Sequence, residues 1–194
     1  MEYKVAVIIP TLNEEKFIAR CLDSVIEQSY PFRDMDVMVV DGGSNDRTRE
    51  IVEEYGRKYI NIRFIHNPGR IQSIAFNIGV ENSDAPYIVR LDAHALYNKD
   101  YIEKCIAGLQ NDTQIGNVGG RCIILPFNDT LWANTNAILN YSRFGIGGSA
   151  FRVGVKPDFV DSVPFGAFPR TVFEKVGGMR EALPRAEDNE NNTR

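Results

Sequence analysis

Short, almost entirely apolar runs alternate along the chain with longer segments in which apolar residues recur at helical spacing. The first run, residues 4–10 ("KVAVIIP"), is typical of a strand that is covered on both faces. Asn13 follows it and is predicted to cap a helix. The apolar positions of that helix are Phe17, Ile18, Cys21, Leu22, Val25 and Ile26.

The same alternation continues beyond this helix. Further strands are predicted at residues 36–41, 61–66, 86–92 and 116–125. Helices are predicted between them, at residues 45–59, 71–80 and 98–109. Such alternation favours an α/β fold with a doubly wound, mostly parallel sheet flanked by helices. No linker interrupts the pattern, so one domain is expected over residues 1–194, with a mobile glycine-rich loop at 144–154.

Composition narrows the class of protein. A chain of 194 residues with 43% hydrophobic and 25% charged residues is typical of one soluble globular domain. Its net charge of −4 provides no basic field, so no nucleic-acid partner is expected. The cysteines form no CxxC pair, and we expect reduced core thiols at Cys21, Cys105 and Cys122. No apolar run approaches the ~20 residues that span a bilayer.

Polar residues gather where the predicted strands end. The strand at 4–10 runs into "PTLNEE", the strand at 36–41 into "DGGSND", and the strand at 86–92 into "DAH". Because open parallel sheets bind ligands at the carboxyl ends of their strands, Asp41 and Asp92 mark a candidate binding rim. The glycines after Asp41 do not fit GxGxxG, and GxxxxGKS/T is absent from the sequence, which argues against a dinucleotide site and a P-loop.

Five ordered motifs resemble a known family. The family 2 glycosyltransferases, which have the nucleotide-binding, Rossmann-like GT-A fold, carry similar motifs in the order seen here: "PTLNEE", "DGGSNDRT", "NPGRIQSIAFNIG", "LDAH" and "AEDNE". The segments "LDAHALY", "VPFGAFPR" and "PRAEDNE" are most similar to the ExoA-type glucosyltransferases of succinoglycan synthesis. The resemblance extends from Lys4 almost to the end of the chain. It implies an inverting transfer of a sugar, glucose in the ExoA type, from a UDP-sugar to an acceptor hydroxyl.

The resemblance also implies which residues bind the donor. Thr11 and Asp41 stand where the family binds uridine, with Asp41 accepting from the uracil N–H; the alternative for Asp41 is a turn or helix-cap residue. Glu14 is assigned to the same site, although the helix dipole alone favours a glutamate in a first helical turn. Arg70 pairs with the diphosphate, since arginine binds phosphate well, or is a solvated surface residue.

The pair Asp92 and His94 stands where the family carries its Asp-x-Asp motif. That motif holds Mg²⁺ or Mn²⁺ against the two phosphates of the donor. The resemblance therefore implies that Asp92 is a metal ligand. His94 departs from the commoner Asp and is either a second ligand, which favours Mn²⁺, or a hydrogen-bonding neighbour of the metal site.

The pair Glu187 and Asp188 stands where the family has a Glu-Asp pair whose Asp is the catalytic base. Read without the family, two adjacent acids in a polar tail would be solvated charges. The family continues from this pair into a helix and a further C-terminal region. Here Asn191 and Thr193 replace the expected apolar residues, and the chain stops at Arg194. We therefore expect a truncated or diverged end and an incomplete acceptor region.

Three functions remain open at this point. The resemblance favours a metal-dependent hexosyltransferase that builds an exopolysaccharide or cell-envelope polysaccharide on a lipid-linked acceptor. It implies a cytoplasmic protein at the inner face of the membrane, associated through a region absent here. A nucleotidyltransferase is the second possibility, although a Gly-rich basic loop is missing after the first strand. The third is a nucleotide-sugar binding module without activity.

Overall fold

The computed structural model describes residues 2–126, 129–139, 159–160, 163, 165–182, 190 and 192–193. The glycine-rich segment 144–154 and the pair Glu187–Asp188 lie outside the described residues.

The centre of the molecule is a sheet whose strand order is β3-β2-β1-β4-β5. The first four strands in the sequence are parallel, and β5 pairs antiparallel with β4. Their bounds are β1 Val5–Thr11, β2 Met35–Asp41, β3 Ile62–His66, β4 Tyr87–Arg90 and β5 Ala167–Pro169. Every residue of β2 and all but one of β1 are buried, as their continuous apolar runs predict for strands covered on both faces. The doubly wound, mostly parallel sheet is confirmed.

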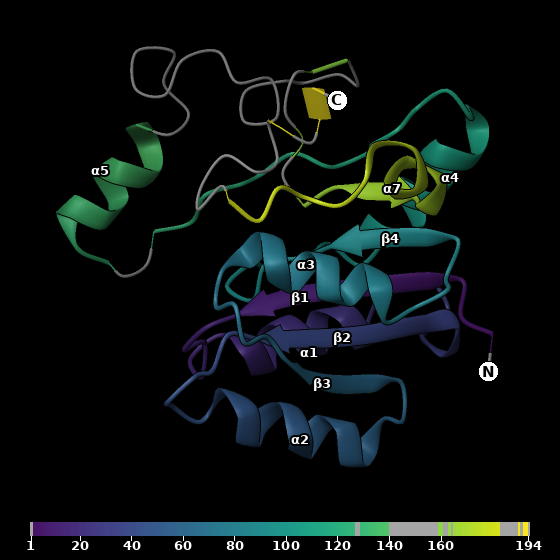
Figure 1. The fold of residues 1–194 in the computed structure, drawn as a ribbon. Coiled ribbons are helices and arrows are strands. Elements are labelled where there is room, and N and C mark those ends of the chain that lie inside the picture. Colours follow the sequence, from purple (N-terminus) through teal and green to yellow (C-terminus); the bar gives the residue numbers. More distant parts are fainter. Residues whose placement is uncertain are drawn as a thin grey trace.

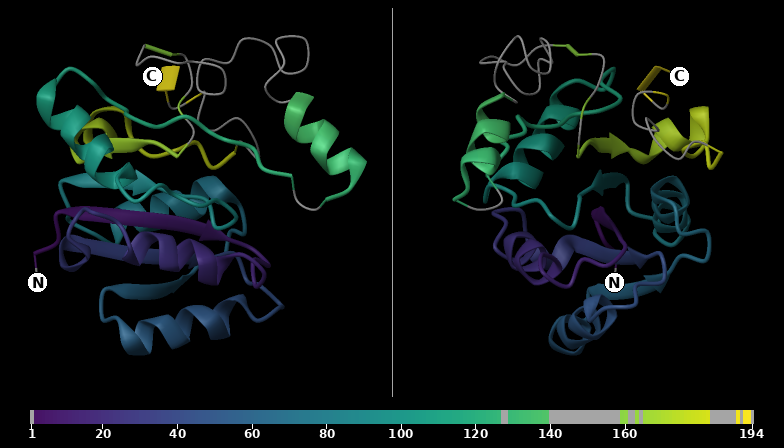
Figure 2. Two further views of the ribbon diagram at one scale, coloured as in Figure 1. Left: turned by 180° about the vertical axis from the view of Figure 1, so that it is seen from behind. Right: turned by 90° about the vertical axis from the view of Figure 1, so that its left-hand side faces the viewer.

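Helices cover both faces of this sheet (Figures 1 and 2). The helices are α1 Ile18–Ile26, α2 Thr48–Lys58, α3 Gln72–Glu81, α4 Tyr101–Asn111, α5 Leu131–Leu139 and α7 Arg170–Val176, with a 3₁₀ turn at Phe32–Asp34. One core cluster joins alternate residues of β1 and β2, such as Val7 and Val39, to α1, α2 and α4. A second cluster joins the residues between them, such as Ile8 and Met38, to α3 and α7. Alternation of side chains along each strand therefore produces two separate cores.

The direction of winding reverses between β1 and β4. From β1 the chain moves outward through β2 to β3, with α1 and α2 on one face, and α3 then carries it back across the other face to β4. After β1 the chain proceeds to β2 on one side, and after β4 it proceeds to β5 on the other side, so the connections diverge at the carboxyl ends of these two neighbouring strands. This is the position at which a ligand site is expected in an open α/β sheet.

The prediction of a strand at 116–125 is wrong. Only Val118 pairs with the sheet, through an isolated antiparallel bridge to Ala167. The chain then passes close to the Tyr101 ring, which would lie only 2.8 Å from the Cβ of any larger residue in place of Gly120. Beyond this point the side chains of Ile123 and Leu125 are 61% and 69% exposed. The outer position beside β4 is taken by the three-residue strand β5, which is too short to show a pattern of its own.

The predicted helix cap at Asn13 is also wrong. Helix α1 begins at Ile18, and Asn13 adopts a left-handed backbone with φ 58°. Its side-chain carbonyl accepts from the backbone N–H of Asn45 at 2.9 Å, so it joins two loops instead of capping a helix. The other predicted helices are present with shifted ends.

Helix α5 is set apart from the sheet (Figure 1) and exposes apolar side chains. Leu131 and Trp132 are 82% and 78% exposed. In the described ranges, no helix is both long and apolar enough to cross a membrane.

Candidate functional site

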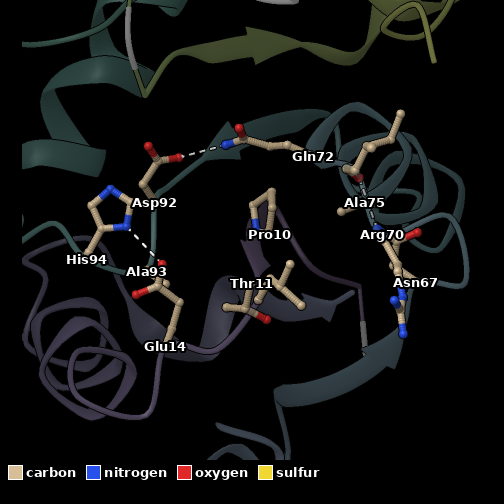
Figure 3. A pocket seen from close by; sticks show the side chains of 12 residues that line it. Pro10, Thr11, Glu14, Asn67, Arg70, Gln72, Ala75, Asp92, Ala93 and His94 are labelled. Atoms are coloured by element: carbon tan, nitrogen blue, oxygen red, sulfur yellow. Dashed lines mark hydrogen bonds and ion pairs between the residues drawn. The ribbon is translucent and has the colours of Figure 1, made fainter. Parts of the chain in front are cut away.

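A pocket of about 170 Å³ opens at the carboxyl ends of β1 and β4, at the point where the winding reverses. Figure 3 shows residues from the β1 loop, the start of α3 and the β4 loop around it. The lining residues are Pro10, Thr11, Leu12, Glu14, Asn67, Arg70, Ile71, Gln72, Ala75, Asp92, Ala93 and His94. Five residues singled out in the sequence thus meet in one place: Thr11, Glu14, Arg70, Asp92 and His94.

Asp41 lies beside this pocket and is 2% exposed. Its Oδ2 accepts from the backbone N–H of Gly43 at 2.9 Å and of Ser44 at 2.8 Å. Its Oδ1 accepts from the hydroxyls of Ser44 at 2.5 Å and Thr11 at 3.2 Å. Four hydrogen bonds fill the usual acceptor capacity of a carboxylate. The structure therefore shows the turn role of Asp41, and its contact with uracil stays a prediction.

The loop after β1 is held against the loop after β2. The backbone N–H groups of Asn13 and Glu14 donate to the hydroxyls of Ser44 and Thr48, at 2.7 and 2.8 Å. The N–H of Glu15 donates to Asp46 Oδ2 at 3.1 Å. These polar side chains explain why "NEE" and "SNDRT" occur after adjacent parallel strands: each satisfies backbone groups of the other. This network of hydrogen bonds holds the backbone of Glu14 at the edge of the pocket.

The carboxylate of Asp92 is held from one side only. Gln72 Nε2 donates to its Oδ1 at 3.2 Å, and the Arg90 guanidinium lies 3.5 Å from the same oxygen. Arg90 is a buried residue of β4, and its side chain is 6% exposed. The second oxygen, Oδ2, accepts no hydrogen bond from the residues that the structure describes, and the Asp92 side chain is 19% exposed at the pocket wall.

Two buried side chains hold the backbone of Asp92. The Asp92 N–H donates to Tyr97 Oη at 2.7 Å, and its carbonyl accepts from the Tyr97 hydroxyl at 3.4 Å and the Cys21 thiol at 3.6 Å. Burial raises the pKa of Cys21 to about 12 and the pKa of Tyr97 well above its usual value, so both stay protonated. Cys21 and Cys105 are buried as predicted, whereas Cys122 is only partly buried.

His94 lines the pocket from the loop that follows β4. Its Nδ1 lies 3.0 Å from Glu14 Oε1, and its other ring nitrogen is on the side of Asp92 (Figure 3). The His94 side chain is 59% exposed, and the Glu14 side chain 19%.

Arg70 stands at the start of α3, on the opposite wall of the pocket. It has a left-handed backbone with φ 64°. The Asn67 side chain supports this turn, accepting from the N–H of Gly69 at 3.0 Å and donating to the carbonyl of Ile71 at 3.0 Å. No side chain caps helix α3, and Ile71, Gln72 and Ala75 at its start line the pocket. A cationic side chain beside an uncapped helix N-terminus favours an anion.

The residues present suit a divalent cation that is completed by a ligand. No group of three or more His, Cys, Asp or Glu residues that could hold a metal occurs among the described residues. Asp92 Oδ2 and His94 supply one hard oxygen and one imidazole nitrogen. Mg²⁺ and Mn²⁺ are commonly held by one or two protein groups together with substrate phosphates. The donor set therefore fits such a cation only alongside a phosphate-bearing ligand.

Several supporting residues were missed in the sequence. Gln72 and Tyr97 contact Asp92 through folding that no spacing rule describes. Gln72 lies in "RIQSIAFN", a family-like segment from which only Arg70 was assigned to the site. Glu187 and Asp188 are not placed, because they lie outside the described residues, but residues after them contact the body of the fold. Glu190 pairs with Arg180 at 2.9 Å.

Comparison with known sequences places this arrangement in context. The family model described as "Glycosyl transferase family 2" matches residues 6–177. A dolichyl N-acetyl-α-D-glucosaminyl phosphate diacetamido-glucuronosyltransferase of Methanococcus voltae is 31% identical over 170 residues, covering 84% of this chain and 52% of that protein. The succinoglycan biosynthesis protein ExoA of Rhizobium meliloti is 29% identical over 186 residues, covering 95% of this chain and 55% of that protein. The chain thus spans about half the length of these curated relatives.

Solved structures show the same fold. A mannosyltransferase of Pyrobaculum calidifontis, solved with GDP-Man and Mn²⁺, has a TM-score of 0.71 at 23% identity and covers 98% of this chain and 51% of its own. TarS of S. aureus, solved with UDP-GlcNAc, has a TM-score of 0.66 at 21% identity and covers 97% of this chain and 52% of its own.

Proposed function

Because the chain belongs to glycosyl transferase family 2, we propose that it transfers a sugar from a nucleoside diphosphate donor to an acceptor hydroxyl, inverting the anomeric carbon. The observation that carries this proposal is the pocket at the winding reversal, which Arg70, Asp92 and His94 line together. A cation-assisted anion site at that position suits a sugar diphosphate. We also propose that residues 1–194 form a single GT-A domain.

We assign different parts of the donor site to the two walls of the pocket. Arg70 and the uncapped start of α3 bind the diphosphate by charge and by N–H donors. Asp92 and His94 hold Mn²⁺ or Mg²⁺ on the other side. When bound, the cation neutralises charge that builds on the leaving diphosphate. Thr11 and Asp41 form the nucleoside end, next to the turn of Gly43 and Ser44.

The acceptor must lose a proton as it attacks, so an inverting transfer needs a base on the acceptor side. We propose Asp188 for this role, with Glu187 as the adjacent acid. Glu190, the second residue after Asp188, pairs with Arg180 at 2.9 Å.

The donor is proposed to be a UDP-sugar, with glucose as the sugar. The UDP-GlcNAc in the TarS structure supports uridine, whereas the GDP-Man in the Pyrobaculum structure favours a different base. A lipid-linked saccharide is the proposed acceptor, supported by the dolichyl phosphate in the name of one relative. The name of ExoA, a succinoglycan biosynthesis protein, supports a role in exopolysaccharide synthesis. We propose that this synthesis takes place at the cytoplasmic face of the membrane.

Calorimetry with a panel of donors tests the proposal. UDP-glucose, UDP-GlcNAc and GDP-mannose are titrated into the protein with Mn²⁺ or with EDTA, and UDP or GDP release is then measured with each. We expect a UDP-sugar to bind in the presence of Mn²⁺. We expect UDP to be released slowly as the sugar is transferred to water or to a glucoside acceptor. Binding without release under any condition would favour the nucleotide-sugar binding module. Absence of binding to all three donors would contradict both.

A further inference from the structure

In the hydrogen bond between Glu14 and His94, the donor and the acceptor can be identified from the chemistry of the two side chains. Glu14 Oε1 lies 3.0 Å from His94 Nδ1. Glutamate side chains are ionised at neutral pH and then only accept hydrogen bonds. The hydrogen of this contact must therefore sit on Nδ1 of His94. In a neutral imidazole the other nitrogen, Nε2, then carries the free lone pair, and it is on the side of Asp92 (Figure 3).

We infer that Glu14 is a positioning residue that holds His94 as the Nδ1–H tautomer, so that Nε2 and Asp92 Oδ2 together bind the cation that accompanies the donor diphosphate. The inference rests on the proposed function for the identity of the ligand. It gives Glu14 a role through His94 and makes His94 a ligand, where the sequence had left both assignments open. A carboxylate that fixes the tautomer of a metal-binding histidine is a general device for orienting the ring and raising its basicity.

The surroundings fit this role, because hydrogen bonds hold the backbone of Glu14 in place, whereas the His94 side chain is largely exposed. The Glu14 N–H donates to Thr48 Oγ1 at 2.8 Å, and its carbonyl accepts from the N–H groups of Phe17 and Ile18, both at 2.9 Å. The His94 side chain is 59% exposed, and Glu14 is its only hydrogen-bond partner within the described part of the chain. Without Glu14 the imidazole would be free to rotate and to exchange its tautomer with water.

The alternative is a surface ion pair between a charged histidine and Glu14. Exposed pairs of this kind contribute about 0–1 kcal/mol and orient little. The two cases separate when the imidazole is neutral. An ion pair is then lost, whereas a hydrogen bond from neutral Nδ1–H persists. A measurement on the neutral imidazole therefore distinguishes positioning from charge pairing.

The chain offers a favourable spectroscopic test, because it contains two histidines, His66 and His94. The ring nitrogens are labelled with ¹⁵N and observed by NMR at pH 8.5, without metal or nucleotide, with His66→Gln to assign the signals. We expect His94 to be mainly the Nδ1–H tautomer and to remain so in Glu14→Gln, which keeps an acceptor oxygen. In Glu14→Ala we expect a mixture of tautomers. Glu15→Ala is the matched control.

Mn²⁺ binding supplies the second measurement, by EPR titration in the presence of UDP. Glu14→Ala should weaken Mn²⁺ binding by about 10–100-fold, the usual effect of removing such a partner, while Glu14→Gln and Glu15→Ala should stay near the wild-type value. An Nε2–H tautomer in the wild type, or unchanged Mn²⁺ affinity in Glu14→Ala, would overturn the positioning role alone. A wild type that binds UDP but no Mn²⁺ would overturn that role together with the metal-dependent part of the proposed function.

Discussion

At the scale of a single residue, Asp41 has a structural role in a turn and a proposed role in binding the nucleoside. Its carboxylate accepts four hydrogen bonds from Thr11, Gly43 and Ser44, and the proposed nucleoside site needs it to accept another from uracil. Gly43 has φ +85°, a backbone conformation that few other residues adopt, so the turn depends on this residue as well as on the carboxylate. Loss of Asp41 should therefore affect folding as well as binding.

We predict that Asp41→Ala lowers the free energy of unfolding by about 1–3 kcal/mol, because buried donors lose their acceptor. Urea unfolding measures this change. Ser44→Ala is the control, since it removes one donor and leaves the carboxylate in place. If Asp41 also accepts from uracil, Asp41→Ala loses more UDP affinity in calorimetry than Ser44→Ala does. Equal affinities for UDP in the two folded variants would restrict Asp41 to the turn.

Asp92 offers a cleaner separation of fold and ligand. Asp92→Asn retains an oxygen for Gln72 and replaces the outward oxygen with an NH₂ group, which removes the negative charge and offers no lone pair to a hard cation. We predict normal thermal unfolding and loss of the Mn²⁺-dependent part of UDP affinity. Calorimetry with Mn²⁺ and with EDTA measures that part. If EDTA leaves the wild-type affinity unchanged, Asp92 has no metal role.

The residues that sequence could identify are those whose chemistry is unusual for their place. Asp92 and His94 stood out because polar residues follow a buried strand directly. Gln72 and Tyr97 did not, because a glutamine at the start of a helix and a tyrosine in a loop are both ordinary. Their importance arises when α3 crosses the sheet and the β4 loop turns back on itself, which local pattern does not encode.

At the scale of elements, Arg170 joins the last part of the fold to the connection between α3 and β4. Its guanidinium donates to the backbone carbonyls of Ala85 at 2.8 Å, Val80 at 3.2 Å and Ser83. One planar, forked side chain thus satisfies carbonyls at and beyond the end of α3, which no helical bond can reach. The same helix carries Gln72 at its other end.

We predict that Arg170→Lys lowers the free energy of unfolding by about 1–3 kcal/mol, because an ammonium group cannot reach the three carbonyls with one fixed geometry. Lys175→Arg, on the same short helix, is the control and should change stability by less than about 0.5 kcal/mol. Urea unfolding of both variants decides the matter. A stable Arg170→Lys would mean that water replaces the guanidinium at no cost.

The elements that the sequence predicted correctly are those with a strong hydrophobic pattern, either a continuous apolar run or apolar residues at helical spacing. Strands β1 and β2 are continuous apolar runs, and α1 repeats apolar residues at helical spacing. The segment at 116–125 has apolar residues as well, but whether it pairs depends on which other segment of the chain occupies the side of β4 away from β1. Residues 167–169 fill that place, and that competition is tertiary.

At the scale of the whole molecule, the reversal of winding between β1 and β4 explains why the candidate site is where it is. Residues from three distant segments, Thr11, Arg70 and Asp92, meet there because parallel strands end at the same edge. A ligand that bridges the two walls must therefore stabilise both halves of the sheet together. On the proposed function, UDP would bind at the Arg70 wall, and Asp92 and His94 would hold a cation beside its phosphates.

This arrangement predicts a synergy between nucleotide and metal in thermal unfolding. Ligand at a hundred times its dissociation constant adds about 2.7 kcal/mol to the stability of the folded state, which raises the Tm of a domain of this size by roughly 5–10 °C. We expect UDP with Mn²⁺ to give such a shift, and either one alone to give much less, because two side chains hold the cation poorly without phosphate. Scanning calorimetry of the wild type and Asp92→Asn measures the effect, with the variant losing the synergy but not the small response to UDP. Additive shifts from UDP and Mn²⁺ would show that the two ligands bind apart, and the bridging site between β1 and β4 would have to be abandoned.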